Sequence, residues 1–154
     1  MPEIIKATTE EHFSAAVNLF TEYAEWLNID LSFQHFDEEL SSVQSMYNND
    51  AGGIILVKEA GTYIACVAVR KSEPGIAELK RMYVRPAFQQ KGIGKQLLDA
   101  ALLLAKSCGY KKIRLDTLNT MLPAMKLYTD NGFYEIPAYY FNPEKTAVYF
   151  EKKL

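Results

Sequence analysis

The sequence has little cysteine, little histidine and no long apolar run. Its 154 residues include 2 cysteines and 2 histidines, too few for a disulfide-stapled secreted scaffold or for a recognisable metal site. The most apolar stretch, residues 97–105, contains Asp99 and falls short of the roughly 20 residues of a membrane span. The N-terminus lacks the apolar core of a signal peptide. These absences predict a soluble, cytoplasmic protein that holds no metal.

An excess of charge of one sign is also missing. Lysine and arginine number 17 against 19 aspartates and glutamates, a formal net charge of −2, which argues against nucleic acid or a membrane surface as a partner. With 49% hydrophobic and 23% charged residues, the composition is that of a folded globule. No repeat, low-complexity tract or linker divides the chain, so residues 1–154 are predicted to form a single domain.

Hydrophobic periodicity predicts alternating strands and helices. A short strand at 4–7 precedes a helix whose N-terminus is marked by Thr8 or Thr9 with Glu10 and Glu11, and a second helix begins near Asp37. The remaining predicted elements are strands at 52–58, 62–70, 76–84 and 112–117, helices at 93–108 and 121–131, and final strands at 133–140 and 146–152. This order predicts an α+β fold with a mixed sheet flanked by helices.

Residues 89–95, Gln-Gln-Lys-Gly-Ile-Gly-Lys, join a predicted strand to a predicted helix. Two glycines let a ligand approach the backbone, and a helix N-terminus offers unpaired amides and a positive dipole end. The segment is typical of a pyrophosphate cradle, although a tight strand–helix turn would have the same residues. Gln89 and Gln96 exclude a Walker loop, which needs glycine and Ser/Thr there, and Leu97 replaces the third glycine of a dinucleotide fingerprint.

Three ordered segments resemble the Gcn5-related N-acetyltransferase (GNAT) superfamily. Residues 89–94 match its acetyl-CoA signature, Gln/Arg-x-x-Gly-x-Gly/Ala; residues 78–86 resemble its fourth strand; and residues 124–133 resemble its Ala-x-x-Leu-Tyr-x-x-x-Gly-Phe segment. The resemblance is close over the C-terminal half and loose over the element order of the whole chain. It implies a mostly antiparallel sheet, splayed into a V around acetyl-CoA, and an N-acetyltransferase that transfers the acetyl group directly to an amine.

The resemblance also implies which residues bind the cofactor. Backbone groups of residues 82–84 would pair with pantetheine like an added strand, and amides of residues 90–95 would hold the pyrophosphate. The implied cofactor-binding residues are Met82, Tyr83, Val84, Gln89, Gln90, Lys91, Gly92, Ile93, Gly94, Lys95, Asn119 and Ala124. Met121 stands where many relatives have an asparagine, so any contact of that asparagine is missing or moved to Asn119.

Catalysis in the family usually needs a base for the amine and an acid for the departing thiolate. An alkylamine with a pKa near 10.4 is neutral in only about one molecule in a few thousand at pH 7, so its deprotonation limits the supply of nucleophile. Tyr128 matches the family tyrosine that protonates the CoA sulfur, with core packing as the alternative. Glu78 is the candidate base, because it precedes Gln89 by 11 positions, the spacing of the histone-acetylating branch. A solvated strand-end carboxylate is the alternative, since many relatives deprotonate through water chains.

The acceptor pocket is the part of the site that the sequence determines least. The resemblance places it between the N-terminal helices and the loop near the last strands. The candidate residues are Phe33, Phe36, Arg70, Arg81 and Tyr139. The aromatic side chains would equally suit a core, and the arginines a cross-strand ion pair. We expect a primary amine of a small molecule or amino-acid-like compound as acceptor, with a protein lysine, a protein N-terminus or a non-catalytic CoA-binding sensor as alternatives. The sequence leaves a homodimer through the C-terminal strands open.

Overall fold

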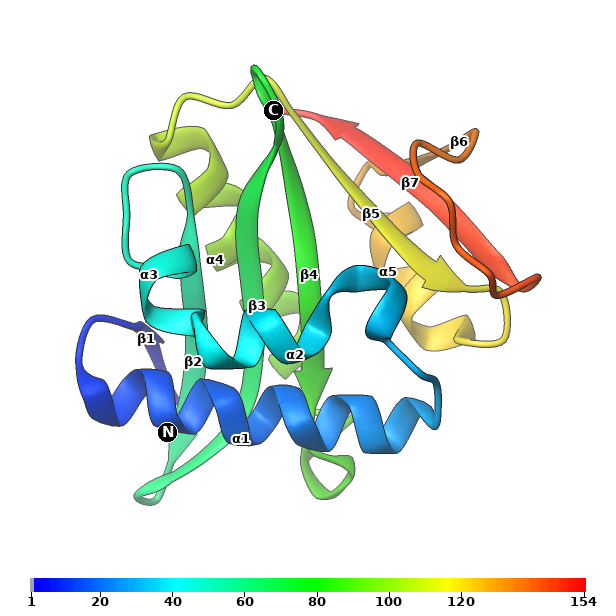
Figure 1. Ribbon diagram of the computed structural model, residues 1–154. Helices are drawn as coiled ribbons and strands as arrows, with labels where there is room; N and C mark the ends of the chain where they lie inside the picture. Colours follow the sequence, from blue (N-terminus) through cyan, green and yellow to red (C-terminus); the bar gives the residue numbers. More distant parts are fainter. Residues whose placement is uncertain (1) are drawn as a thin grey trace.

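A computed structural model describes residues 2–154, apart from the side chain of Phe33. Its elements are β1 (Glu3–Lys6), α1 (Glu10–Leu27), η1 (Ser32–Gln34), α2 (Phe36–Ser41), α3 (Val43–Tyr47), β2 (Gly53–Glu59), β3 (Thr62–Glu73), β4 (Ile76–Val84), η2 (Pro86–Phe88), α4 (Ile93–Ser107), β5 (Lys112–Leu118), α5 (Leu122–Asp130), β6 (Tyr134–Ile136) and β7 (Ala147–Lys153). The strands form a seven-stranded sheet in the order β1-β2-β3-β4-β5-β7-β6 (Figure 1). Only β4 and β5 pair in parallel, which confirms the predicted mixed α+β sheet.

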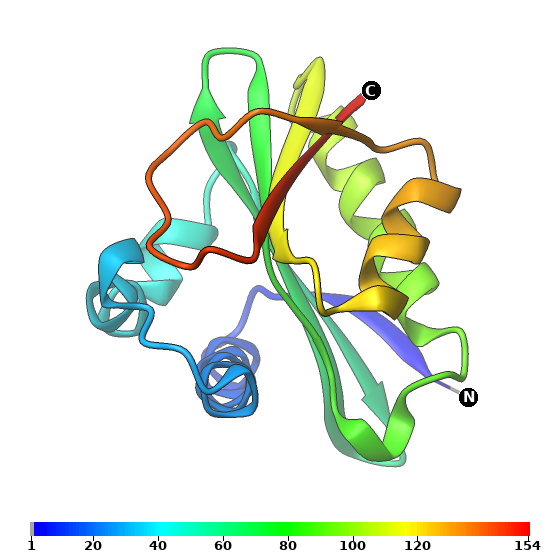
Figure 2. The same cartoon turned by 90° about the vertical axis from the view of Figure 1, so that its right-hand side faces the viewer.

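Helices cover both faces of this sheet, α1, α2 and α3 on one face and α4 and α5 on the other (Figure 2). Successive side chains of a strand point to opposite faces, and β3 therefore feeds two cores. Ala65, Val67 and Val69 join the core beneath α4, whereas Cys66 and Ala68 join the core beneath α1. An apolar run such as residues 65–69 is the pattern expected of a strand buried on both sides.

The helix ends lie where local sequence places them. At the start of α1 the Thr9 hydroxyl accepts a hydrogen bond from the His12 amide at 3.2 Å, and His12 Nδ1 accepts one from the Thr9 amide at 3.3 Å, a capping box with histidine in place of the usual Glu or Gln.

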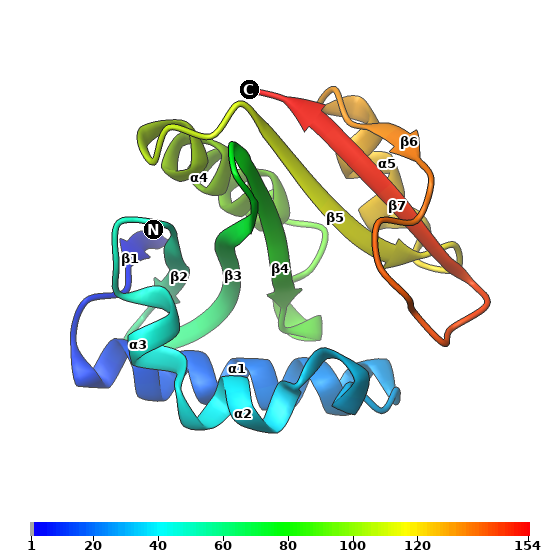
Figure 3. The ribbon, with the colours of Figure 1, turned by 45° about the horizontal axis from the view of Figure 1, so that its top comes forward.

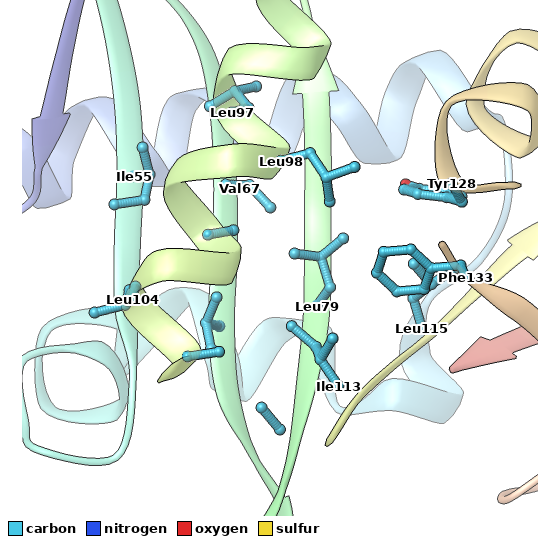
Figure 4. Packing of buried hydrophobic residues seen from close by; sticks show 14 of the residues in the cluster. Ile55, Val67, Leu79, Leu97, Leu98, Leu104, Ile113, Leu115, Tyr128 and Phe133 are labelled. Carbon is cyan, nitrogen blue, oxygen red and sulfur yellow. The ribbon is translucent and has the colours of Figure 1, made fainter. Parts of the chain in front are cut away.

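The apolar face of α4, with Leu97, Leu98 and Leu104, lies against the sheet (Figure 4). Within residues 2–154, no helix is both long and apolar enough to cross a bilayer.

Three predicted elements differ from the structure by more than one residue at an end or in their continuity. β3 continues to Glu73. The helix predicted from Asp37 is divided into α2 and α3, because Ser42 leaves the helical region (φ −123°, ψ 17°). The strand predicted at 133–140 is only β6, since Pro137 follows it directly and has no amide to continue the ladder. Residues 137–146 instead form a loop that returns toward the α1 face.

The sheet splits between β4 and β5 (Figure 3). The two strands pair only at Ile76–Lys112, Ala77–Ile113 and Glu78–Arg114. Beyond Glu78, β4 stays with β3, while β5 pairs with β7 along its whole length. Each strand follows its own outer partner, so the two diverge and leave a V-shaped gap in the middle of the sheet.

A β-bulge shapes the β4 side of this gap. Ala68 pairs with Lys80 and Cys66 pairs with Tyr83, so two residues of β4 stand opposite one of β3. One of them, Arg81, has a φ of +58°, which is costly for a residue with a Cβ. Its guanidinium is held by Glu39 of α2 with contacts of 2.8 and 3.2 Å. This buried pair helps to hold the bulge and ties α2 to β4.

Candidate active site

A cavity of about 520 Å³ lies in the gap between β4 and β5, a size typical of small-molecule and cofactor sites. Its walls come from α1, β4, the 88–95 turn, β5 and α5. The lining residues are Tyr23, Trp26, Leu79, Lys80, Arg81, Met82, Tyr83, Val84, Phe88, Gln89, Gln90, Gly92, Gly94, Lys95, Leu115, Asp116, Thr117, Thr120, Met121, Pro123, Ala124, Leu127 and Tyr128. The cavity is thus bordered by elements from both faces of the sheet, α5 on one side and α1 on the other.

A second hollow, of about 830 Å³, lies between α1 and the α2–α3 segment. It is larger but more open, and its lining is mainly neutral, with Glu10 as the one charged side chain. Neither a strand edge nor a glycine turn contributes to it. The cavity in the split sheet is therefore the better candidate for chemistry.

Unpaired backbone amides border this cavity at the start of α4. Within the described chain, the amides of residues 90–95 donate no hydrogen bond to another residue, and no side chain caps the helix. Gln90 and Gly92 have φ values of +62° and +81°, which turn this run of amides around the entry to the helix. With the positive end of the helix dipole added, the turn is suited to an anion.

Gly94 keeps this border open. A Cβ there would lie 3.4 Å from Leu127 Cδ2 and 3.7 Å from Met82 Cε, in ordinary contact with both, so the rest of any larger side chain would enter the cavity. Of the two lysines in the turn, Lys95 pairs with Asp99 at 2.9 Å, and Lys91 lies over the Phe88 ring at 5.5 Å.

Tyr128 is part core and part cavity wall. Its ring packs at 5.5 Å from that of Phe133 and 6.4 Å from that of Phe150, in the same buried cluster as Leu115 (Figure 4). Its hydroxyl makes one weak contact, to Met82 Sδ at 3.6 Å, across the gap from α5 to β4. Burial raises the pKa of the phenol, so Tyr128 is protonated at neutral pH and has a proton to donate.

On the α1 face, the cavity meets a cluster of charged side chains. Lys80 is buried, donates to Gln34 Oε1 at 3.2 Å and lies 3.9 Å from Glu78. Burial lowers the pKa of Lys80 to about 8, even though the charge of Glu78 opposes that shift. Asp116 of β5 lines the same end and accepts a hydrogen bond from Asn142 at 3.2 Å. Desolvation raises the pKa of the Asp116 carboxyl, with a hydrogen bond from Tyr140 opposing.

Glu78 lies outside the cavity lining. It is buried where β4 and β5 still pair, and its carboxylate accepts hydrogen bonds from Arg70 Nε at 3.1 Å and the Tyr139 hydroxyl at 2.8 Å. The solvated strand-end carboxylate that the sequence allowed is therefore not what is found. In the structure Glu78 holds together β3, β4 and the 137–146 loop.

The other sequence-predicted residues divide into two sets. The cofactor-binding residues that line the cavity are Met82, Tyr83, Val84, Gln89, Gln90, Gly92, Gly94, Lys95 and Ala124; Lys91, Ile93 and Asn119 do not line it. Asn119 is exposed, and its amide donates to the carbonyl of Thr146 at 2.8 Å.

Among the acceptor-pocket candidates whose side chains the structure describes, only Arg81 lines the cavity, and it is paired with Glu39. Arg70 and Tyr139 are engaged by Glu78, and Phe36 is buried against the Arg81 guanidinium at 5.0 Å. The Phe33 side chain lies outside the described part of the structure. Sequence reasoning missed Tyr23, Lys80 and Asp116. Nothing in the local pattern singles them out, because β4 and β5 each carry two further charged residues and Tyr23 is one of several aromatic residues in α1.

Known proteins are similar to this chain in sequence and in fold. A model of the acetyltransferase (GNAT) family matches residues 13–133. An uncharacterised N-acetyltransferase of Schizosaccharomyces pombe is 38% identical over 133 residues, covering 85% of this chain and 82% of its own. An IAA acetyltransferase of Azospirillum brasilense is 27% identical and matches over 100% of both chains.

Solved structures agree over nearly the whole chain. A GNAT acetyltransferase of Staphylococcus aureus superposes with a TM-score of 0.81 at 20% identity, covering 99% of both chains. The PaiA N-acetyltransferase of Thermoplasma acidophilum, solved in complex with coenzyme A, gives a TM-score of 0.76 at 22% identity, covering 100% of this chain and 99% of that one. A GNAT acetyltransferase of Elizabethkingia anophelis with acetyl-CoA bound gives 0.68 at 23% identity, covering 99% and 98%. With the family model matched over most of its length, this chain belongs to the GNAT family of N-acetyltransferases.

Proposed function

We propose that this N-acetyltransferase transfers the acetyl group of acetyl-CoA directly to a primary amine of a small molecule or amino-acid-like acceptor. The observation that carries the proposal is the cavity through the split sheet. It has free amides at its α4 border, the Tyr128 hydroxyl in the gap, and aromatic and charged side chains at its α1 end. Two reactants could therefore approach each other from opposite faces.

The residues at the α4 border fit coenzyme A. The amides of residues 90–95 would bind the pyrophosphate, because they are unpaired and at the positive end of α4. The β4 residues 82–84 would pair with the pantetheine arm, since beyond Glu78 this strand has no ladder partner on the β5 side. Ala124 of α5 borders the same cavity and leaves room for the arm. Bound acetyl-CoA supplies an activated thioester.

In this proposal Tyr128 protonates the departing sulfur. Its phenol is protonated at neutral pH, and within residues 2–154 its hydroxyl has only a thioether as hydrogen-bond partner, so it is free to turn toward a new acceptor. A β4 amide near Met82 would stabilise the negative charge that develops on the carbonyl oxygen. The remaining contribution is positioning, since the gap holds the two reactants together.

Glu78 stays in the proposal as a base only by way of water. Its carboxylate is already bonded to Arg70 and Tyr139 and does not line the cavity, so an amine could reach it only through bridging molecules. Removal of Glu78 would also leave Arg70 with an unpaired charge. Loss of activity in a Glu78 variant would therefore not distinguish a base from a structural residue.

The acceptor end supports a small molecule over a protein segment. Tyr23 and Trp26 wall the cavity on the α1 side, and the charges beside them are mixed in sign, unlike the open acidic groove that a lysine-rich segment would favour. The whole-length relative named as an IAA acetyltransferase supports a small-molecule acceptor, without specifying a primary amine. Acetylation of protein lysines or N-termini, and a sensor without turnover, are the competing functions.

The remaining parts of the proposal concern the whole chain. Residues 1–154 would act as one acetyltransferase domain, because all seven strands belong to one hydrogen-bonded sheet. Two strands of that sheet, β4 and β5, line opposite sides of the cavity. A cytoplasmic location is supported by two cysteines that are both free, Cys66 and Cys108.

The proposal is tested by titrating acetyl-CoA calorimetrically into the purified protein and then measuring thiol release over a panel of primary amines and lysine peptides. We expect saturable acetyl-CoA binding and turnover on one class of small amine. Turnover on peptides alone would support protein acetylation. Binding without any turnover would support a sensor, and absence of binding would overturn the cofactor assignment.

A further inference from the structure

Asp116 is the carboxylate that lines the cavity at its α1 end. It lies in β5 opposite Tyr149 of β7, and its neighbour Leu115 points to the core beneath α4. Since side chains alternate along a strand, Asp116 faces the α1 side. Tyr128, by contrast, enters the cavity from the α4 and α5 side. A carboxylate and a phenol thus border one cavity from opposite faces of the split sheet.

The other charges near Asp116 are engaged by different partners. The charges that act on Asp116 are those of Lys80, Arg81 and Glu78. Arg81 is paired with Glu39, and Lys80 lies beside Gln34 and Glu78. Asp116 receives only neutral donors, the amide of Asn142 and the hydroxyl of Tyr140, and forms no ion pair within 4.0 Å among the described residues. It therefore keeps acceptor capacity for a cation inside the cavity.

We propose that Asp116 binds the ammonium group of the acceptor and removes its proton before attack. This inference rests on the proposed function and deepens it, because it assigns the base to β5 rather than to Glu78. Two bonded neutral donors hold the carboxylate in place while leaving it able to accept a proton. Burial disfavours its charged form, which brings its basicity closer to what proton abstraction needs.

The proton balance is simple. Asp116 takes one proton from the ammonium, and the freed lone pair forms the bond to the acetyl carbon. As the carbon–sulfur bond breaks, Tyr128 gives its proton to the sulfur. The second proton lost from nitrogen restores the phenol, and the proton on Asp116 passes to solvent. The products are the amide, the free thiol and one proton.

The test uses two probe amines of nearly the same shape. 2-Phenylethylamine is mostly an ammonium ion at pH 7, whereas O-benzylhydroxylamine, with oxygen in place of a methylene, is mostly neutral there. Asp116→Asn should lower kcat/KM for 2-phenylethylamine by about 10²- to 10⁴-fold, as expected for loss of a general base. It should lower kcat/KM for O-benzylhydroxylamine by less than about tenfold, because that amine needs no base. Rates without enzyme are subtracted.

Binding gives a readout that does not depend on turnover. With coenzyme A present in place of acetyl-CoA, calorimetry should show 2-phenylethylamine binding about tenfold more weakly to Asp116→Asn, and O-benzylhydroxylamine binding equally to both proteins. Asp116→Glu keeps a carboxylate and should preserve the rate ratio of the two amines. Asp130→Asn, an exposed aspartate of α5 paired only with Lys126, is the matched control and should resemble the wild type.

If Asp116→Asn loses kcat/KM equally on both amines, Asp116 is a structural residue. If kcat/KM is unchanged on both, Asp116 takes no part in the reaction. Either result overturns this assignment while the acetyltransferase proposal stands. If the wild type turns over a different panel amine, that amine and its alkoxyamine analogue replace the two probes. If the wild type turns over no amine at all, the proposed function fails, and this assignment fails with it. If Asp116→Asn fails to bind acetyl-CoA, Asp116→Glu is compared with the wild type instead. A preference between the two amines that is reversed relative to the wild type would then contradict the assignment.

Discussion

Tyr128 combines a buried ring with a hydroxyl that has almost no partner. The ring contacts Phe133 and Phe150, and among the described residues the hydroxyl contacts only the Met82 sulfur, a weak acceptor. A purely structural tyrosine at this depth would be expected to bond a stronger acceptor. At this position the packing holds the ring, and the hydroxyl is left available to a bound ligand.

Tyr128→Phe should therefore lower turnover by about 10²-fold, as for loss of a general acid, with acetyl-CoA affinity and thermal stability nearly unchanged. Thiol release, calorimetry and thermal unfolding measure the three quantities. Tyr134→Phe is the control, since that exposed residue bonds Glu151 at 2.6 Å outside the cavity. Wild-type turnover in Tyr128→Phe would assign the residue to the core.

Among the elements, α4 has two separate tasks. Its apolar face, with Leu97, Leu98 and Leu104, packs on the sheet, whereas its first turn presents free amides to the cavity. Packing of the apolar face fixes the position of the first turn, because both belong to one rigid helix. The bound anion can then be held without any side chain of specific chemistry.

Gly94→Asp separates these two tasks. An acidic residue in the first turn of a helix is favourable by about 0.3–1 kcal/mol, so the variant should fold at least as stably as the wild type. Its affinity for acetyl-CoA should nevertheless fall by about 10²-fold or more, since a carboxylate would face the pyrophosphate across a few ångströms. Calorimetry and thermal unfolding measure both. Gln96→Asp, exposed and outside the cavity lining, adds the same charge and should bind normally.

At the scale of the whole molecule, the sheet separates two cores, and the elements that form them must keep their relative positions around the gap. The pair of Arg81 and Glu39, both buried, connects the α1–α3 layer to β4 at the bulge, and the Tyr47 hydroxyl also donates to Glu39 at 3.1 Å. Burial alone would raise the pKa of Glu39, but the Arg81 guanidinium outweighs it and lowers the pKa. The pair therefore stabilises the fold only while Glu39 is ionised.

A lowered pKa in the folded state means that this stability is fully present above the unfolded value, near 4.5, and is lost as the pH falls through the folded value. Glu39→Gln should reduce the free energy of unfolding at pH 7 by about 3 kcal/mol, because Arg81 keeps an unpaired buried charge. The difference from wild type should shrink below pH 4.5. Urea unfolding at several pH values measures it.

Glu38→Gln, on the same helix but exposed, is the matched control and should change stability by less than about 0.5 kcal/mol. A difference between Glu39→Gln and wild type that stays constant down to acid pH would show that the carboxylate charge does not contribute.

Much of the fold, and the turn with unpaired amides before α4, follow from local sequence. Thr9 marks the start of α1, and Gly109, with a φ of +89°, lies just beyond α4. Residues 89–95 lie between β4 and the first turn of α4, and Tyr128 lies in α5, as the residue patterns predicted. These features depend on hydrogen bonds and side-chain periods within about ten residues, which a sequence pattern records directly. The division of α2 from α3 was missed because a single Ser42 left the helical region.

By itself, then, the sequence determined the alternating elements, the free amides of the 90–95 turn and the family to which they belong. Only the tertiary structure decided which charges face the cavity. Glu78 and Asp116 are both acidic residues of strands, yet Arg70 and Tyr139 engage the first, while the second lines the gap beside Asn142, 26 positions away. The difference depends on where β4 and β5 part, and that point is set by pairing with β3 and β7 and by the bulge at Arg81. Long-range pairing of this kind leaves no mark in a local pattern, because it comes from the packing of whole elements.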